Sequence, residues 1–142
     1  MSRLELVRDG VLGHPFHRAC ELALDHSADG RAEIRFAVNA FTANPQGALH
    51  GGILYAMMDV ACFFAVVPLL ESDQHPVSVE VHTSVLRAAL QGDTVIIRSW
   101  VDRLGRTLAA MRCDALVKEA DGSERLIGTG NVTKSILTGR GR

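Results

Sequence analysis

The sequence lacks several features that mark common classes of protein. It has no surplus of charge, since 15 Lys and Arg residues face 16 Asp and Glu residues for a net charge of -1. Neutralising a nucleic-acid backbone requires clustered Lys and Arg, so this balance argues against such a role. No repeat, low-complexity tract or Pro/Ser-rich linker divides the 142 residues, and 47% of them are hydrophobic. We therefore expect a single domain over residues 1–142, with an ordered core over about 14–136.

The sequence also lacks the residue spacings that are typical of metal sites and of disulfide-bonded frameworks. Cys20, Cys62 and Cys113 are an odd number at wide spacings, which suits neither a disulfide framework nor a paired-cysteine site. We expect them to be reduced core residues. Among the six histidines only His14 and His17 have a ligand-like spacing, and no third donor is nearby, so no metal site is predicted. Without a nucleotide-binding glycine motif or a G-x-S-x-G turn, no bound cofactor is predicted either.

Long apolar runs are absent except for one, from Ile53 to Leu70, in which Asp59 is the only charge. Its 18 residues reach the lower limit for a transmembrane helix. A membrane span is disfavoured because Asp59 would lie near mid-bilayer, Pro68 interrupts the end, and no Lys/Arg pair flanks the run. The first ten residues carry a charge every few positions and so do not form a secretion signal. The sequence thus predicts a cytoplasmic protein whose apolar helix is covered by the rest of the chain.

The remaining sequence alternates in the way that is typical of β-strands. Alternating runs occupy residues 20–25, 31–38, 77–85, 94–101, 107–118 and 126–136. Three hairpins are indicated by turn residues at Asp29-Gly30, 102–106 and Asp121-Gly122. In the run 77–85 the valines are expected to pack, and Ser78 lies on the opposite, polar face. We predict an α+β fold of order roughly β-β-α-β-β-β-β, an antiparallel β-sheet around one long central α-helix.

The segment from Asn44 to Gly52 leads directly into the predicted helix and ends in His50-Gly51-Gly52. Adjacent glycines let a ligand approach the backbone closely, and a helix N-terminus offers unpaired N–H groups with partial positive charge. Such donors can stabilise an oxyanion on a carbonyl by about 2.7–4 kcal/mol each in the transition state. A plain loop-to-helix turn would use the same glycines, and that interpretation stays open on these residues alone.

Asp59 is costly within an apolar run unless it is paired, hydrogen-bonded or used in chemistry. Its neighbours on the same helix face include Tyr55 and Phe63, which do not belong to a solvent-exposed stripe, although a structural hydrogen bond remains an alternative. A carboxylate here can activate a water or attack a carbonyl itself. Gly51 and Asp59 would lie about 12 Å apart along one helix, too far to act on one carbonyl. If both act, Asp59 comes from a second copy across a twofold axis.

These spacings resemble a known family. Asn44, His50-Gly51-Gly52, Asp59 nine residues after the histidine, and Ser78 near the start of the next strand are similar to the hotdog-fold acyl-CoA thioesterases of the PaaI-like (phenylacetic acid degradation) group. The resemblance covers about residues 17–136 in element order. It implies a hotdog fold, hydrolysis of an acyl-CoA thioester, and no cofactor beyond the CoA of the substrate. It also implies a homodimer, or a homotetramer of two dimers, with sites shared between subunits.

The resemblance implies a role for each matching residue. The Gly51 backbone N–H would polarise the thioester carbonyl. Asp59 of the partner subunit would be the general base or the nucleophile, and Ser78 would hold the attacking water beside it. Asn44 and His50 would shape the loop and the leaving-thiol side of the site.

Contacts with the rest of the substrate are expected from Gly52 and from basic residues, because coenzyme A carries phosphates. Arg103 and Arg106 flank the glycine of a predicted hairpin, and a solvated surface charge is the alternative for both. Further basic residues near the end of the chain could contribute, namely Lys134, Arg140 and Arg142. Ala88 stands where relatives often carry proline. The acyl pocket is expected to be lined by Tyr55, Met57, Met58, Phe63 and Phe64.

Two other functions stay open at this point. The same helix N-terminus could bind acyl-CoA without turnover in a regulatory protein, although Asp59 favours an enzyme. A hotdog hydratase or dehydratase would pair a catalytic histidine with a carboxylate against the β-carbon of the acyl group. The His50-Gly51-Gly52 sequence fits the thioesterase pattern better, and the identity of the acyl group is not predicted.

Overall fold

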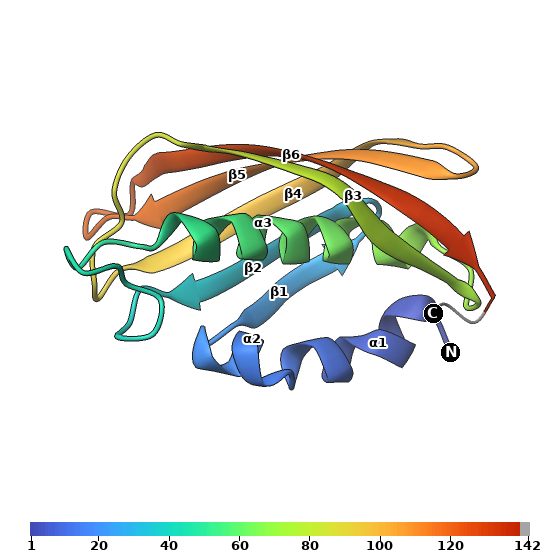
Figure 1. The fold of residues 1–142 in the computed structure, drawn as a ribbon, viewed down its shortest axis with the longest axis horizontal. Helices are drawn as coiled ribbons and strands as arrows, with labels where there is room; N and C mark the ends of the chain where they lie inside the picture. Colours follow the sequence, from blue (N-terminus) through green and yellow to red (C-terminus); the bar gives the residue numbers. More distant parts are fainter. Residues whose placement is uncertain (140–142) are drawn as a thin grey trace.

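One long helix, α3 (Gly51–Val66), is wrapped by a six-stranded antiparallel sheet (Figure 1). This computed structural model describes residues 1–139. The strands are β1 (Ala23–Ala28), β2 (Arg31–Ala37), β3 (Gln74–Val85), β4 (Thr94–Leu104), β5 (Leu108–Lys118) and β6 (Glu124–Thr138). Their order in the sheet is β1-β2-β4-β5-β6-β3, so β3 and β1 are the edges. The predicted α+β class and the order of strands around one helix are confirmed.

The β1–β2 hairpin forms where the Asp-Gly step predicts it. Asp29 and Gly30 both have positive φ, 56° and 73°, as a two-residue turn with right-handed strand twist requires. The expected start of the first strand is wrong, because Cys20 ends a short helix and Glu21 has a φ of 57°. The chain therefore enters the sheet only at Ala23.

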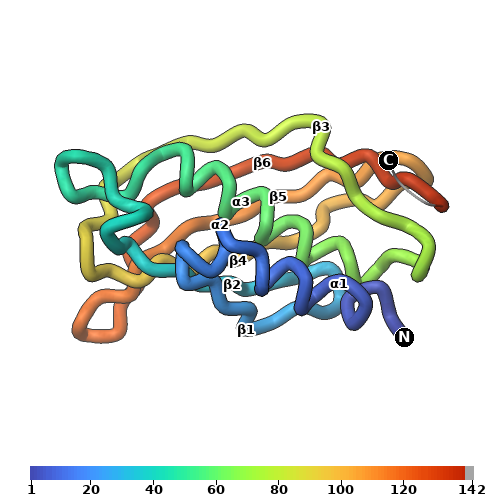
Figure 2. Tube along the Cα trace, turned by 60° about the horizontal axis from the view of Figure 1, so that its bottom comes forward, coloured from blue at the N-terminus to red at the C-terminus, as the bar shows by residue number. Residues whose placement is uncertain are grey.

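Two helices precede the sheet, α1 (Arg3–Leu12) and α2 (Pro15–Ala19), and strand alternation does not predict them. Ser2 and Glu5 form a capping box at the start of α1. The His14 side chain accepts a hydrogen bond from the Phe16 N–H at the start of α2. Figures 1 and 2 show this segment running beside β1, and Leu4, Val11, Leu12 and Phe16 pack against the core. The N-terminal helices thus close one side of the molecule.

The sequence of α3 explains its central place. Eight of its side chains are buried: Leu54, Met57, Met58, Ala61, Cys62, Phe64, Ala65 and Val66. Buried Ser99 donates from Oγ to the Ala61 carbonyl oxygen at 2.7 Å, which ties the helix to β4. Pro68 falls in a short 3₁₀ turn, η1 (Val67–Leu69), so the regular helix ends earlier than the apolar run. Gly51–Leu69 is long and apolar enough to cross a membrane, but here it is the core helix of the sheet.

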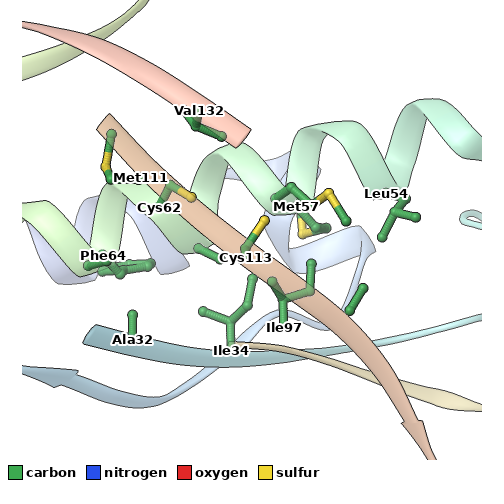
Figure 3. Close-up of a cluster of buried hydrophobic side chains, with 14 of the residues drawn as sticks. Ala32, Ile34, Leu54, Met57, Cys62, Phe64, Ile97, Met111, Cys113 and Val132 are labelled. Carbon is green, nitrogen blue, oxygen red and sulfur yellow. The ribbon is translucent and has the colours of Figure 1, made fainter. Parts of the chain in front are cut away.

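The three cysteines are free and buried, as expected. Figure 3 shows Cys62 of α3 and Cys113 of β5 among buried apolar side chains. The pKa of the Cys62 thiol is raised mainly by a hydrogen bond with Cys113 and also by burial. Burial alone raises the pKa of the Cys20 thiol. Both thiols therefore resist ionisation and behave as apolar packing groups.

The edge strand β3 does not pack as its valines predict. Val77, Val79 and Val85 are exposed, and Val79 is 62% exposed. A β-bulge between Ser78 and Glu80 adds a residue and switches the side chains that face the core. Before the bulge Ser78 faces α3, and after it Val81 packs on the core. Within one chain the expectation that the valines pack is therefore wrong for Val77, Val79 and Val85 and correct for Val81.

Candidate active site

A carboxylate, a hydroxyl and an ammonium group meet where α3 passes the β3–β6 pair. Asp59 comes from α3, Ser78 from β3, and Lys134 from β6, in register with Ser78. The Ser78 Oγ donates to Asp59 Oδ1 at 2.6 Å. Lys134 Nζ donates to the same Oδ1 at 2.7 Å and to Ser78 Oγ at 2.9 Å. The three groups form a closed triangle.

Burial differs strongly between the two charged members of this triangle. The Lys134 side chain is 3% exposed, whereas the Asp59 side chain is 34% exposed. Removing an ammonium from water is costly unless a counter-charge and acceptors replace the water, and Asp59 and Ser78 do so here. The sequence does not reveal this pair, because its members lie 75 residues apart. The sequence suggests Lys134 as a phosphate contact, but here its ammonium donates to Asp59 and Ser78.

A pocket of about 250 Å³ opens beside the triangle. Apart from the triangle it is lined by Val11, His17, Val60, Phe63 and Pro76, so the N-terminal helices supply one wall. His17 Nδ1 lies 2.6 Å from the Val11 carbonyl oxygen. Because a carbonyl oxygen only accepts, Nδ1 carries the hydrogen, and Nε2 of the neutral ring keeps its lone pair. The pocket thus combines apolar walls with a small group of polar atoms.

Gly51 lies in a second pocket of about 330 Å³, together with Asn44, Arg87 and apolar residues. The Gly51 N–H has no acceptor among the residues that the structure describes, and the space beside its Cα is open. The Gly52 N–H instead donates to His50 Nδ1 at 3.0 Å. Gly51 therefore offers a free donor at the positive end of the α3 dipole.

Asn44 and His50 shape the loop before α3. Asn44 Oδ1 accepts from the N–H groups of Gln46 and Ala48, both at 3.0 Å. His50 is the N-cap of α3, and its Nδ1 accepts a hydrogen bond, so Nε2 carries the hydrogen in the neutral ring. Both side chains hold the turn that presents Gly51.

The structure does not bring the two halves of the predicted site together in one chain. Asn44 and Gly51 line one pocket, and Asp59 and Ser78 line the other. The separation agrees with the distance expected between Gly51 and Asp59 along a single helix.

The basic residues near Gly51 differ from those that the sequence pattern suggests. Arg103 and Arg106 lie at the β4–β5 hairpin, at the end of the sheet opposite the N-terminus of α3 (Figure 1). Arg87 lines the Gly51 pocket and is the basic residue that the sequence pattern misses. Arg140 and Arg142 lie outside the described residues.

The expected acyl pocket is only partly present. Met57, Met58 and Phe64 are completely buried in the core, and Tyr55 is 47% exposed. Of the five expected lining residues, Phe63 alone lines one of the two pockets described above.

The sequence is similar to that of a curated bacterial protein. The chain is 35% identical to a candidate esterase of Deinococcus radiodurans over 91 aligned residues. The alignment covers 64% of this chain and 59% of that protein. The match thus spans well under two thirds of the length of this curated relative.

Solved structures extend the similarity to the whole fold. A thioesterase family protein from Silicibacter pomeroyi superposes with a TM-score of 0.87 at 28% identity, over 97% of this chain and all (100%) of that chain. A point mutant of the phenylacetic acid degradation protein PaaI from Thermus thermophilus superposes with a TM-score of 0.74 at 26% identity, over 85% of this chain and 97% of that chain. A hypothetical thioesterase from Streptococcus pneumoniae, solved with coenzyme A, superposes with a TM-score of 0.78 at 20% identity, over 95% of this chain and 99% of that chain. At this identity the similarity shows that the two chains share a fold.

The profile of the thioesterase superfamily matches residues 46–122, more than half of the chain, from the loop before Gly51 to the β5–β6 turn. This segment carries the open helix N-terminus and the partly exposed carboxylate of Asp59, and the fold around them is that of the hotdog thioesterases. The resemblance inferred from the motif spacing is confirmed: the chain belongs to the thioesterase superfamily.

Proposed function

We propose that the protein hydrolyses an acyl- or aryl-CoA thioester to the free acid and CoA. The observation that carries this proposal is the position of Asp59. It is fixed by Ser78 and Lys134 at the edge of a partly apolar pocket, and one side of its carboxylate remains accessible. A group held in this way can activate water or attack an acyl carbon.

The second half of the proposed site is the N-terminus of α3. The Gly51 N–H and the helix dipole stabilise the negative charge that develops on the thioester oxygen. Asp59 of the partner subunit then acts as general base or nucleophile on the carbonyl carbon, with Ser78 beside it. Asn44 and His50 hold the loop on the leaving-thiol side.

The edge strand β3 supports a homodimer. An unpaired strand edge offers free backbone N–H and C=O groups to a second strand, and exposed Val77 and Val79 add apolar surface. An antiparallel pairing of two β3 strands places the two α3 helices antiparallel and creates two identical shared sites. A homotetramer built from two such dimers is an extension of the same proposal.

Coenzyme A would lie along the Gly51 pocket, with Gly52 close to it. Arg87 lines this pocket and would pair with a phosphate of the ligand. In an antiparallel dimer the β4–β5 hairpin of the second protomer, which carries Arg103 and Arg106, reaches the same end of the site. The S. pneumoniae relative, solved with coenzyme A, supports this ligand class. No other cofactor and no metal ion takes part, and we place the protein in the cytoplasm.

The proposal is tested by measuring thiol release from aryl, short-chain and long-chain acyl-CoA esters. We expect hydrolysis of at least one class, and a loss on the order of 10²-fold or more in Asp59→Asn. Lys118→Met, at an exposed end of β5, is the control. Equal rates for wild type and Asp59→Asn would remove Asp59 from the mechanism. Tight binding without hydrolysis would favour a binding protein, and water loss from a 3-hydroxyacyl thioester would favour a hydratase or dehydratase.

A further inference from the structure

We infer that Lys134 is a positioning residue that fixes the direction of every hydrogen bond in the Asp59–Ser78 pair, so that this pair presents only acceptors to the attacking water. The inference rests on the proposed hydrolysis and adds the residue that orients the water. It starts from the closed triangle of hydrogen bonds, in which Lys134 is the most deeply buried member.

The fold alone does not require an ammonium group at this position. A buried ion pair is weak evidence for stability, since an apolar side chain of similar volume often serves a core equally well. The other lysine of the chain, Lys118, lies exposed at the end of β5. Lys134 instead directs its charge at two groups of the proposed site, so its specific effect falls on Asp59 and Ser78.

The donor inventory of the three groups determines the hydrogen-bond directions. An ammonium group only donates, so Ser78 Oγ must accept from Lys134. The single hydroxyl hydrogen of Ser78 then points to Asp59 Oδ1. Oδ1 receives two donors, while Oδ2 receives none from the residues that the structure describes. What remains for a ligand is Oδ2 and one lone pair on Ser78 Oγ.

A water bound to these two acceptors must direct both hydrogens at the protein. Its oxygen lone pair is then free to attack the thioester carbon, which is the orientation that general-base catalysis needs. As the O–C bond forms, one water proton passes to Asp59 Oδ2. Collapse of the tetrahedral intermediate breaks the C–S bond, and the departing thiolate takes that proton to give CoA and the free acid.

Three substitutions separate this role from simple filling of the core. Lys134→Met removes the donor, Lys134→Arg keeps a group that only donates, and Lys134→Gln introduces an amide that can also accept. We expect single-turnover hydrolysis to fall on the order of 10²-fold in Lys134→Met, with KM changed far less than kcat. Lys134→Gln should stay low and Lys134→Arg should recover part of the rate. Lys118→Met should match wild type.

Several results would overturn the inference. It is overturned if Lys134→Met hydrolyses the substrate at the wild-type rate, or if Lys134→Gln and Lys134→Arg recover the rate equally. It is also overturned if the substitutions change KM and leave kcat unchanged. If Lys134→Met does not fold, as judged by thermal unfolding, the comparison of Gln with Arg decides the question. Failure of the proposed function looks different, because wild type itself would then hydrolyse no acyl-CoA ester.

Discussion

At the scale of single residues, the sequence identifies Asp59 but not the reason why the fold tolerates it. The cost of a carboxylate in an apolar helix is visible from the sequence. Its partners, Ser78 and Lys134, come from two different strands and meet it only in the folded protein. The family resemblance implies that Ser78 acts beside Asp59, but no local spacing pattern predicts the contact with Lys134. Alternation alone predicts that Ser78 points away from the core, whereas its hydroxyl points toward α3 and donates to Asp59, although the residue as a whole stays exposed.

The same pair predicts how single and double substitutions change stability. Asp59→Asn leaves the buried Lys134 ammonium without a counter-charge and should lower the free energy of unfolding. The loss should be smaller than the roughly 3–5 kcal/mol typical of a fully buried pair, because Asp59 is partly exposed. The double variant Asp59→Asn/Lys134→Met removes the unpaired charge and should regain part of the loss.

Denaturant unfolding at one fixed protein concentration measures this cycle. Strictly additive losses would show that Lys134 and Asp59 do not interact. The result also matters for activity assays, because a drop in Asp59→Asn must be separated from a loss of folded protein.

At the scale of elements, periodicity predicts the sheet and the helix well but places their ends and faces less well. The apolar run from Ile53 to Leu70 corresponds to α3, which begins two residues earlier and gives way to a 3₁₀ turn near Pro68. The alternation along β3 is real, but the bulge after Ser78 reverses its phase. A bulge depends on pairing with β6 and has no signature in the alternation itself. The capping box of α1, by contrast, is readable from Ser2 and Glu5.

Packing of α3 against β6 predicts a sharp contrast between two glycines. A Cβ at Gly130 would lie 2.7 Å from Met58 Sδ and 2.8 Å from Cys113 Sγ, so Gly130→Ala should destabilise the protein by about 1–3 kcal/mol. Gly10 lies within α1 with nothing near its Cβ position. Gly10→Ala should therefore stabilise by about 0.5–1 kcal/mol.

The midpoints of urea unfolding for both glycine variants check this contrast. A Gly130→Ala protein as stable as wild type would mean that α3 does not pack on β6 as closely as the structure places it.

At the scale of the whole molecule, the two halves of the proposed site lie in separate pockets of one chain. The single apolar run correctly predicts a central helix wrapped by an antiparallel sheet. The distance between Gly51 and Asp59 predicts a second copy, and the two separate pockets agree with it. In the proposed dimer, that copy would cover the exposed valines of β3. Arg87 shows what the sequence missed, because only the folded loop brings it beside Gly51.

Subunit complementation tests the shared site most directly. Gly51→Pro removes the proposed donor with little disturbance, since proline is tolerated at the first position of a helix and the space there is open. Gly51→Pro and Asp59→Asn should each be nearly inactive as homodimers. In a mixed dimer, one of the two sites combines an intact Gly51 with an intact Asp59.

The measurement is acyl-CoA hydrolysis by the two variants co-expressed with different tags, with mixed dimers verified by mass. Random pairing predicts recovery to about a quarter of wild-type activity, because half of the dimers hold one complete site of two. Mixed dimers that form but stay as inactive as the parents would contradict a site shared between Gly51 of one protomer and Asp59 of the other.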